Sequence, residues 1–212
     1  MSNETESSQQ WKNILDRDIL KDSINMVALF VTVYELLEDT IISKPKDFYT
    51  IWEFDDKSRK EYVDQVLSLY DKSVCPGITT NNKELISSLI WFKHNGTIDA
   101  NDIKVFADSR VLRNKVTHEM LYTIAEGGKQ LVEQFAMMYA LFCKIERWWI
   151  LEIEVPISGE YEPGEIDQQE VMSGQMLVLE TILDILANDS NVNFKEVCEL
   201  LGVPVKYTNY IS

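Results

Sequence analysis

The chain has 212 residues, of which 45% are apolar and 26% charged, and its formal net charge is −15. This length and composition favour one globular core and argue against several large domains. So negative a charge excludes a general nucleic-acid coat, because such proteins bind phosphates through a basic surface and release counterions. RNA remains a candidate substrate if the few cations gather in one groove, and a basic protein partner is an equal alternative.

The amino terminus and the cysteines indicate the compartment. Residues 1–10 are polar and hold nothing large and apolar, so they predict a disordered tail rather than a secretory signal. The most apolar stretch, Ile24 to Ile42, is interrupted by three carboxylates, which argues against a membrane span. The cysteines lie far apart, as expected for buried thiols in a reducing cytoplasm: Cys75, Cys143 and Cys198. We therefore expect a soluble cytoplasmic protein with no contact to a membrane.

Apolar residues recur at helical spacing almost throughout the chain. The first predicted helix begins at Ser23 and stops at Pro45, with one buried stripe made of Met26, Phe30, Val33, Leu37 and Ile41. The later helices are expected over 58–72, 83–94 with Asn82 as its cap, Asp99 or Asn101 to about Ala125, Gln130 to about Glu152, Gln168 to Ala187, and a short 194–201 capped by Asn193. Two prolines and two glycines make 155–167 an acidic loop, with a short hairpin as the alternative.

These elements predict an all-α fold, a helical bundle of four to five long helices with a short C-terminal helix. The expected organisation is a tail over 1–10, the bundle over 11–188 and a small helical extension over 189–212. Trp148 and Trp149 lie in an apolar run, so they are expected in the core or at an interface rather than against bases.

The helix expected from Asp99 to about Ala125 carries the candidate chemistry. At about 100° per residue, its core stripe comprises Val105, Ser109, Leu112, Val116 and Met120. The opposite stripe comprises Ala107, Arg110, Asn114, His118 and Leu121. A guanidinium binds phosphate oxygens bidentately, and a histidine exchanges protons near neutral pH. Spacing alone also fits a solvated helix face without any catalytic role.

The segment RNKVTH (113–118) resembles the active-site signature of HEPN domains (higher eukaryote and prokaryote nucleotide-binding). That signature is an arginine, a polar residue that is commonly Asn, Asp or His, three variable residues and a histidine. The resemblance implies an all-α bundle that dimerises with its signature helices paired. Many members are metal-independent ribonucleases of toxin–antitoxin, abortive-infection and CRISPR-linked antiviral defence systems.

The resemblance implies a role for each signature residue. Arg113 would steady the scissile phosphate, His118 would perform acid–base work, and Asn114 would support His118. Arg110 and Lys115 are further cations expected to bind the RNA substrate. Two copies of the helix would bring two histidines into one cleft and so supply both an acid and a base. The expected activity is a homodimeric endoribonuclease that forms a 2′,3′-cyclic end without a cofactor.

Two features bear on the partner and on metals. The toxins that pair with a nucleotidyltransferase carry a tyrosine two residues after the histidine, where this chain has Met120, so a stand-alone effector is favoured. An antitoxin or another regulatory protein remains a possible partner. Glu35, Glu38 and Asp39 share one side of the first helix, but the ExxH partners of a di-iron site are absent, so we expect no metal. Glu35 instead is a candidate for orienting Arg113.

A second hypothesis comes from a different class of protein. The chain would be a non-catalytic helical module that keeps the fold for dimerisation or regulation and binds a protein partner. The charge of −15 favours this alternative. The two hypotheses differ in whether the arginines and His118 meet in an open groove between subunits.

Overall fold

The computed structural model describes residues 12, 15–50, 56–126, 128–159, 166–167, 170–188 and 192–202. These residues form helices, joined by turns and short loops, and contain no β-strand, which confirms the all-α prediction. The predicted tail over 1–10 lies outside the described residues. In the part of the chain that the structure describes, no helix is long and apolar enough to cross a membrane.

The long α-helices form the body of the molecule, and shorter helical segments connect them. The α-helices are α2 (Arg17–Thr50), α3 (Asp56–Gln65), α4 (Lys83–His94), α5 (Ala100–His118), α6 (Met120–Ala125), α7 (Val132–Trp149), α8 (Val155–Ser158), α9 (Gly174–Asn188) and α10 (Val192–Leu201). The 3₁₀ segments are Leu67–Leu69, Lys72–Val74 and Lys129–Leu131, and a π-helical segment spans Ile150–Glu154.

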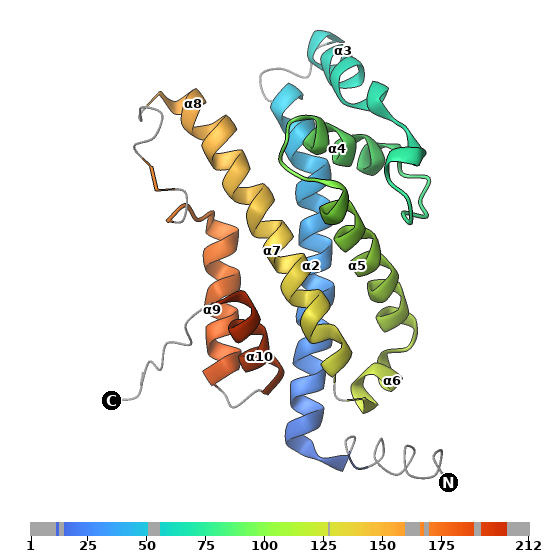
Figure 1. Ribbon diagram of the computed structural model, residues 1–212, viewed down its shortest axis with the longest axis vertical. Coiled ribbons are helices and arrows are strands. Elements are labelled where there is room, and N and C mark those ends of the chain that lie inside the picture. Colours follow the sequence, from blue (N-terminus) through green and yellow to red (C-terminus); the bar gives the residue numbers. More distant parts are fainter. Residues whose placement is uncertain are drawn as a thin grey trace.

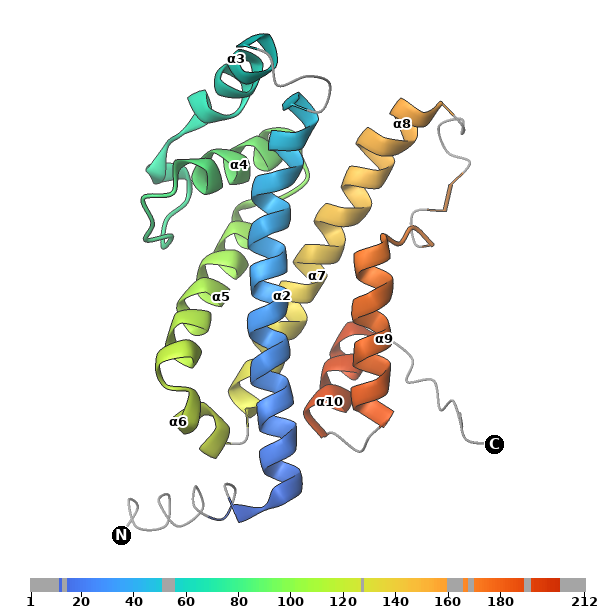
Figure 2. The same cartoon turned by 180° about the vertical axis from the view of Figure 1, so that it is seen from behind.

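Helix α2 runs through the middle of the bundle along its long axis, as Figures 1 and 2 show. Helix α5 flanks α2 on one side and α7 crosses it on the other, while α9 and α10 lie beyond α7. Helices α3 and α4 pack at one end, and α6 packs against the other end of α2. Because α2 contacts α4, α5, α6 and α7, its buried stripe organises the core.

The predicted stripe on α2 is confirmed, because all five of its apolar side chains are completely buried: Met26, Phe30, Val33, Leu37 and Ile41. The three cysteines are free thiols in buried positions, as expected. Helix α10 packs against α7 and α9, and its Phe194 and Val197 are fully buried in the same core cluster. Burial of large side chains such as these is the main favourable term in folding.

The predicted stop at Pro45 is wrong, because α2 continues through this buried proline to Thr50. A proline inside a helix removes one backbone hydrogen bond and crowds the preceding turn. The turn after Pro45 is held by aromatic contacts: Phe48 lies 6.1 Å from Trp149 between ring centroids. The Trp91 indole N–H donates to the Tyr49 hydroxyl at 3.3 Å. These tertiary contacts offset the local cost, which the helix pattern alone does not show.

Other helix boundaries also differ from the sequence prediction. The second helix ends at Gln65 and tightens into the 3₁₀ segment Leu67–Leu69. Residues 155–158, expected in a loop, extend the line of α7 as α8. Helix α9 begins at Gly174 rather than at Gln168, a residue outside the described part of the chain. Asn193, expected as a cap, is buried inside α10.

Substitution of Phe106 tests the contact between α2 and α5. Its ring is fully buried and lies 5.7 Å from the stacked ring of Tyr34. We expect Phe106→Ala to lower the free energy of unfolding by about 3–5 kcal/mol, because it removes a buried ring and leaves a cavity. Urea unfolding followed by circular dichroism measures this change. The control Val178→Ala, at an exposed site on α9, should change stability by less than about 0.5 kcal/mol, and equal losses in both variants would contradict the packing.

Candidate functional site

The start of α5 is fixed by a capping box. The Asp99 carboxylate accepts from the backbone N–H groups of Asn101 at 2.7 Å and Asp102 at 2.9 Å. The Asp102 carboxylate in turn accepts from the Asp99 N–H at 2.9 Å. The hydrogen bond from the Asp102 backbone is the largest cause that lowers the pKa of Asp99. These reciprocal bonds confirm Asp99 as the cap and set where the following side chains lie around the helix.

The helix ends earlier than expected, at His118. Glu119 leaves the helical conformation (φ −119°, ψ 33°), and α6 begins at Met120 in a new direction. The bend lets α6 bury Thr123, Ile124 and Ala125 and pack against α2. A single straight helix through Ala125 would carry these residues past the bundle. The prediction of one continuous helix is therefore wrong, and the bend leaves His118 on the last turn of α5.

The two predicted stripes on α5 are only partly right. Ser109 and Val116 are buried as expected, whereas Met120 is 45% exposed, because it belongs to α6 after the bend. Ala107, assigned to the outer stripe, is buried instead. A β-carbon built at Gly77 would lie 3.6 Å from that of Ala107, so the loop that precedes α4 covers this position.

Arg113 is anchored to α2 and is joined to its neighbour in the signature. Its Nη2 forms an ion pair with Glu35 of α2, and its Nη1 donates to the Asn114 side-chain oxygen at 3.2 Å. The guanidinium carbon lies 5.7 Å from the centre of the Tyr34 ring. Arg113, Asn114 and Glu35 are therefore brought together, with the guanidinium held between a carboxylate and an aromatic ring.

Arg110 is committed to a second set of contacts on α2. Its Nη1 lies 2.7 Å from Glu38 Oε2 and donates to the Tyr34 hydroxyl at 2.9 Å. The Tyr34 hydroxyl in turn donates to Glu38. Burial, and then the Glu38 carboxylate, raises the pKa of Tyr34 well above its ordinary value. Arg110, which stays a predicted substrate-binding residue, is thus ion-paired within its own chain and links α5 to α2.

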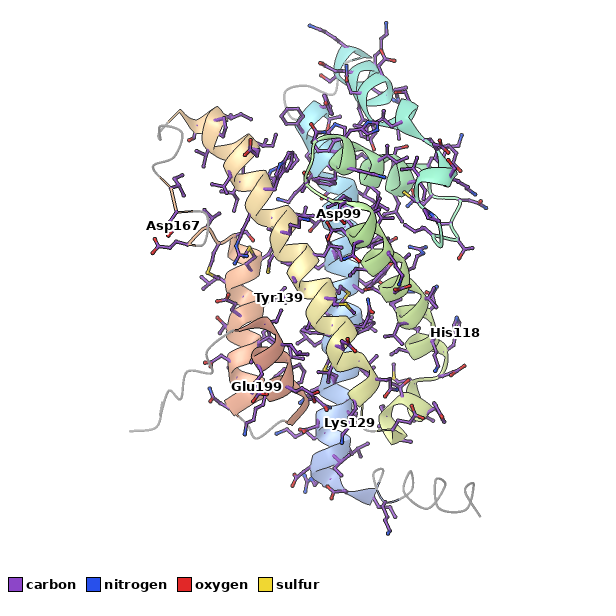
Figure 3. All side chains as sticks on the ribbon, in the orientation of Figure 1. Asp99, His118, Lys129, Tyr139, Asp167 and Glu199 are labelled. Carbon is purple, nitrogen blue, oxygen red and sulfur yellow. The ribbon has the colours of Figure 1, made fainter. Side chains whose placement is uncertain are left out.

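His118 and Lys115 lie apart from this network. Both are exposed, and His118 is at the edge of the molecule away from α7 and α9 (Figure 3). His118 lines an open pocket of about 530 Å³ formed by residues 117–122. Its side chain makes no hydrogen bond or ion pair with another described residue. The Lys115 ammonium lies 6.0 Å from the centre of the ring of Tyr122, which belongs to α6. One chain therefore does not bring His118 into contact with Arg113.

The surface next to His118 is apolar. Met120, Leu121 and Tyr122 begin α6 directly after the bend, and they are 45%, 80% and 47% exposed. We call these three residues the α6 apolar surface. Such adjacent exposed apolar residues mark a contact site more often than isolated ones do.

Tyr34 was missed in the sequence, although it stacks under one arginine and bonds to the other. Its position four residues before Glu38 was the available signal, because side chains at this spacing meet on a helix. The two arginines lie more than 70 residues away in the sequence. Only the pairing of α2 with α5 reveals these contacts.

No protein-family model, no curated protein and no solved structure matches this chain. Within the described residues, no group of three or more His, Cys, Asp and Glu side chains is placed to hold a metal ion. The interpretation of the site therefore depends on the geometry of its own residues.

The Tyr34 hydroxyl offers a test of this network. We expect Tyr34→Phe to lose about 1.5–3 kcal/mol of stability, because the hydroxyl bonds to two charged groups. The raised pKa means that the unfolded chain loses the phenol proton first, so this stabilisation is complete below pH 10.0 and declines above it. Urea unfolding of both proteins at a series of pH values measures the difference. A difference that is the same on both sides of that pH would contradict the contact.

Proposed function

We propose that this protein is a metal-independent endoribonuclease that acts as a homodimer, with Arg113, Asn114 and His118 of both copies in one reaction centre. One observation carries the proposal: the exposed His118 borders the α6 apolar surface, and one turn earlier on α5 the exposed Asn114 bonds to an arginine that α2 holds in place. The resemblance of RNKVTH to the HEPN signature supports the same residues.

Arg113 has the geometry of a phosphate-orienting group. Glu35 forms an ion pair with one edge of the guanidinium, and the Tyr34 ring packs against its face. The orientation of the guanidinium is therefore fixed before substrate binds. Such preorganised charge acts on the transition state without a cost of reorganisation. The Asn114 oxygen accepts from Arg113, which leaves the amide NH₂ of this exposed residue to donate to a phosphate oxygen.

Two copies of His118 supply the proton transfers. One neutral imidazole takes the proton of the RNA 2′-hydroxyl as its oxygen forms a bond to the adjacent phosphorus. The bond from phosphorus to the 5′-oxygen breaks, and the protonated His118 of the second copy donates a proton to that leaving oxygen. The products are a 2′,3′-cyclic phosphate and a 5′-hydroxyl, so no water, metal or redox partner is consumed in this step.

Dimerisation follows from the same surface. His118 and Arg113 do not meet within one chain, so a centre that uses both needs a second copy at the carboxyl end of α5. A two-fold contact would cover the α6 apolar surface of each copy and bring the two α5 ends together. Such burial supplies the free energy for association.

The net charge of −15 shapes how RNA reaches this centre. An acidic surface repels the phosphate backbone everywhere except where cations gather. Lys115, exposed one turn from His118, adds a cation at the face where RNA would bind. We assign the protein to the toxin or antiviral-defence class on its resemblance, and Met120 in place of the tyrosine favours a stand-alone effector.

The alternative is a non-catalytic helical module that binds a protein partner, such as an antitoxin or regulatory protein. The acidic charge favours it, and so does the Arg113–Glu35 ion pair, which already neutralises the guanidinium. In this case the α6 apolar surface binds the partner and His118 has no chemical role.

Substitution of the two histidines separates the hypotheses. We expect His118→Ala to fold normally, because the side chain is exposed, and to lose at least about 10²-fold in cleavage rate, because its acid–base role is removed. The matched control is His94→Ala, the other histidine, which is exposed at the end of α4. The measurement is cleavage of total RNA and a defined transfer RNA in EDTA, with identification of the end groups.

Cleavage by the parent and His94→Ala, with cyclic phosphate ends and none from His118→Ala, supports the ribonuclease. Equal cleavage by the parent and His118→Ala would exclude His118 from the chemistry. Absence of cleavage by every protein would favour the binding module.

A further inference from the structure

A second pocket lies on the outer side of α5, along its amino-terminal half, and none of the signature residues lines it. Its volume is about 650 Å³, which is within the usual range for small-molecule sites. It lies between α5, the end of α4 and the loop over 73–77. Neither the predicted ribonuclease chemistry nor the α6 apolar surface uses it.

Hydrogen bonds within the loop hold the wall that it forms. Asp71 accepts from the Ser73 backbone N–H at 2.8 Å, which holds the start of the loop. The Ile78 N–H then donates to the Cys75 carbonyl at 3.3 Å across a turn. Gly77 in this turn has φ +89°, a conformation that favours glycine. The pocket wall is therefore formed before any ligand binds.

The lining combines an aliphatic interior with a positive charge. Val74, Pro76, Ile103, Ala107 and Val111 supply the apolar surface. Charged lining groups are two lysines and one aspartate, which leaves one positive charge in excess in a chain of net charge −15.

Lys93 supplies that excess charge. Lys104 is paired with Asp108 at 2.5 Å, whereas the Lys93 ammonium makes no hydrogen bond or ion pair with another described residue. Its ammonium charge opposes the effect of burial on the Cys75 pKa and helps to lower the Asp99 pKa, so it is close to both. Lys93 is half-buried at the end of α4, where it is available to an anionic group of a ligand.

From this combination we propose that the pocket binds one nucleoside phosphate unit. The base would lie between the aliphatic side chains, and the phosphate would bind Lys93. Lys104 bonds to Oδ2 of Asp108, which leaves Oδ1 to accept from a base amino group, a pairing that proteins use to recognise cytosine. A fatty acyl anion would bind Lys93 but would offer no donor to that oxygen. A base with an attached phosphate occurs both in an RNA strand and in a free nucleotide, so the pocket fits either one.

The position of the pocket favours a strand as the source, an extension that rests on the proposed ribonuclease. Ala100, Lys104, Ala107 and Val111 line the pocket, and Asn114 and His118 continue their spacing of three and four residues on the same face of α5. Val111 and His118 are two turns apart, about 10 Å along the axis. RNA that follows this face would place a base in the pocket near the bond to be broken.

The test measures binding without cleavage. Isothermal titration calorimetry with AMP, CMP, GMP and UMP, and with a 2′-O-methyl RNA hexamer, uses ligands that lack the nucleophile or the scissile bond. We expect Lys93→Gln to weaken binding of both kinds of ligand by about tenfold, because it removes a charged hydrogen-bond donor. The matched control is Lys83→Gln, which makes the same change on α4 outside the pocket and should bind as the parent does.

The outcomes separate the pocket from the ribonuclease. Hexamer binding that exceeds mononucleotide binding, with both dependent on Lys93, assigns the pocket to the substrate strand. Equal Lys93-dependent binding assigns it to a free nucleotide. Absence of mononucleotide binding, or equal binding by Lys93→Gln and the parent, overturns the proposal that the pocket binds a nucleotide. This holds whether or not His118 cleaves RNA. Conversely, Lys93-dependent binding without any cleavage overturns the ribonuclease alone.

Discussion

The contact between α2 and α5 determines what every residue of the candidate site can do. Two arginines three residues apart on α5 meet two carboxylates three residues apart on α2, Arg110 with Glu38 and Arg113 with Glu35. The order is reversed between the helices, as antiparallel packing requires. Partly exposed ion pairs of this kind add little stability, but the matched spacing fixes how α5 is rotated about its axis. That rotation turns Asn114 and His118 outward.

This arrangement divides the signature between an inner and an outer side of one helix. Arg113 leans inward onto Tyr34 and Glu35, while His118 stands at the end of α5 beside an exposed apolar surface. A single copy therefore presents an oriented cation and a histidine that do not touch. A second copy placed at this end of α5 would bring the two groups together. Such positioning of reacting groups accounts for a large part of the barrier lowering by an enzyme. The proposed reaction centre thus depends on association as much as on its residues.

Much of the fold follows from local rules in the sequence. The stripe from Met26 to Ile41 and the caps at Asn82 and Asp99 were predictable, because helical periodicity and capping chemistry act over a few residues. The continuation of α2 beyond Pro45 and the bend at Glu119 were not, since distant aromatic contacts and the packing of α6 on α2 decide them. The site shows the same limit.

The signature and the possible role of Glu35 were visible in the sequence. The pairing of Arg110 with Glu38 and Tyr34 was not, because it joins residues 72 and 76 positions apart. The pocket beside Lys93 also depends on three separate segments that meet only in the folded chain. Periodicity can place a residue on a helix face, but the partner of that face comes from tertiary packing.

Mixed dimers test the composite centre most directly. Parent protein and His118→Ala are unfolded together in equal amounts, refolded, and assayed on RNA in EDTA at one total concentration. If both histidines serve one centre, only parent homodimers are active, and the rate falls to about a quarter of that of the parent alone. If each chain works by itself, the rate falls only to about one half, and that result would contradict the account.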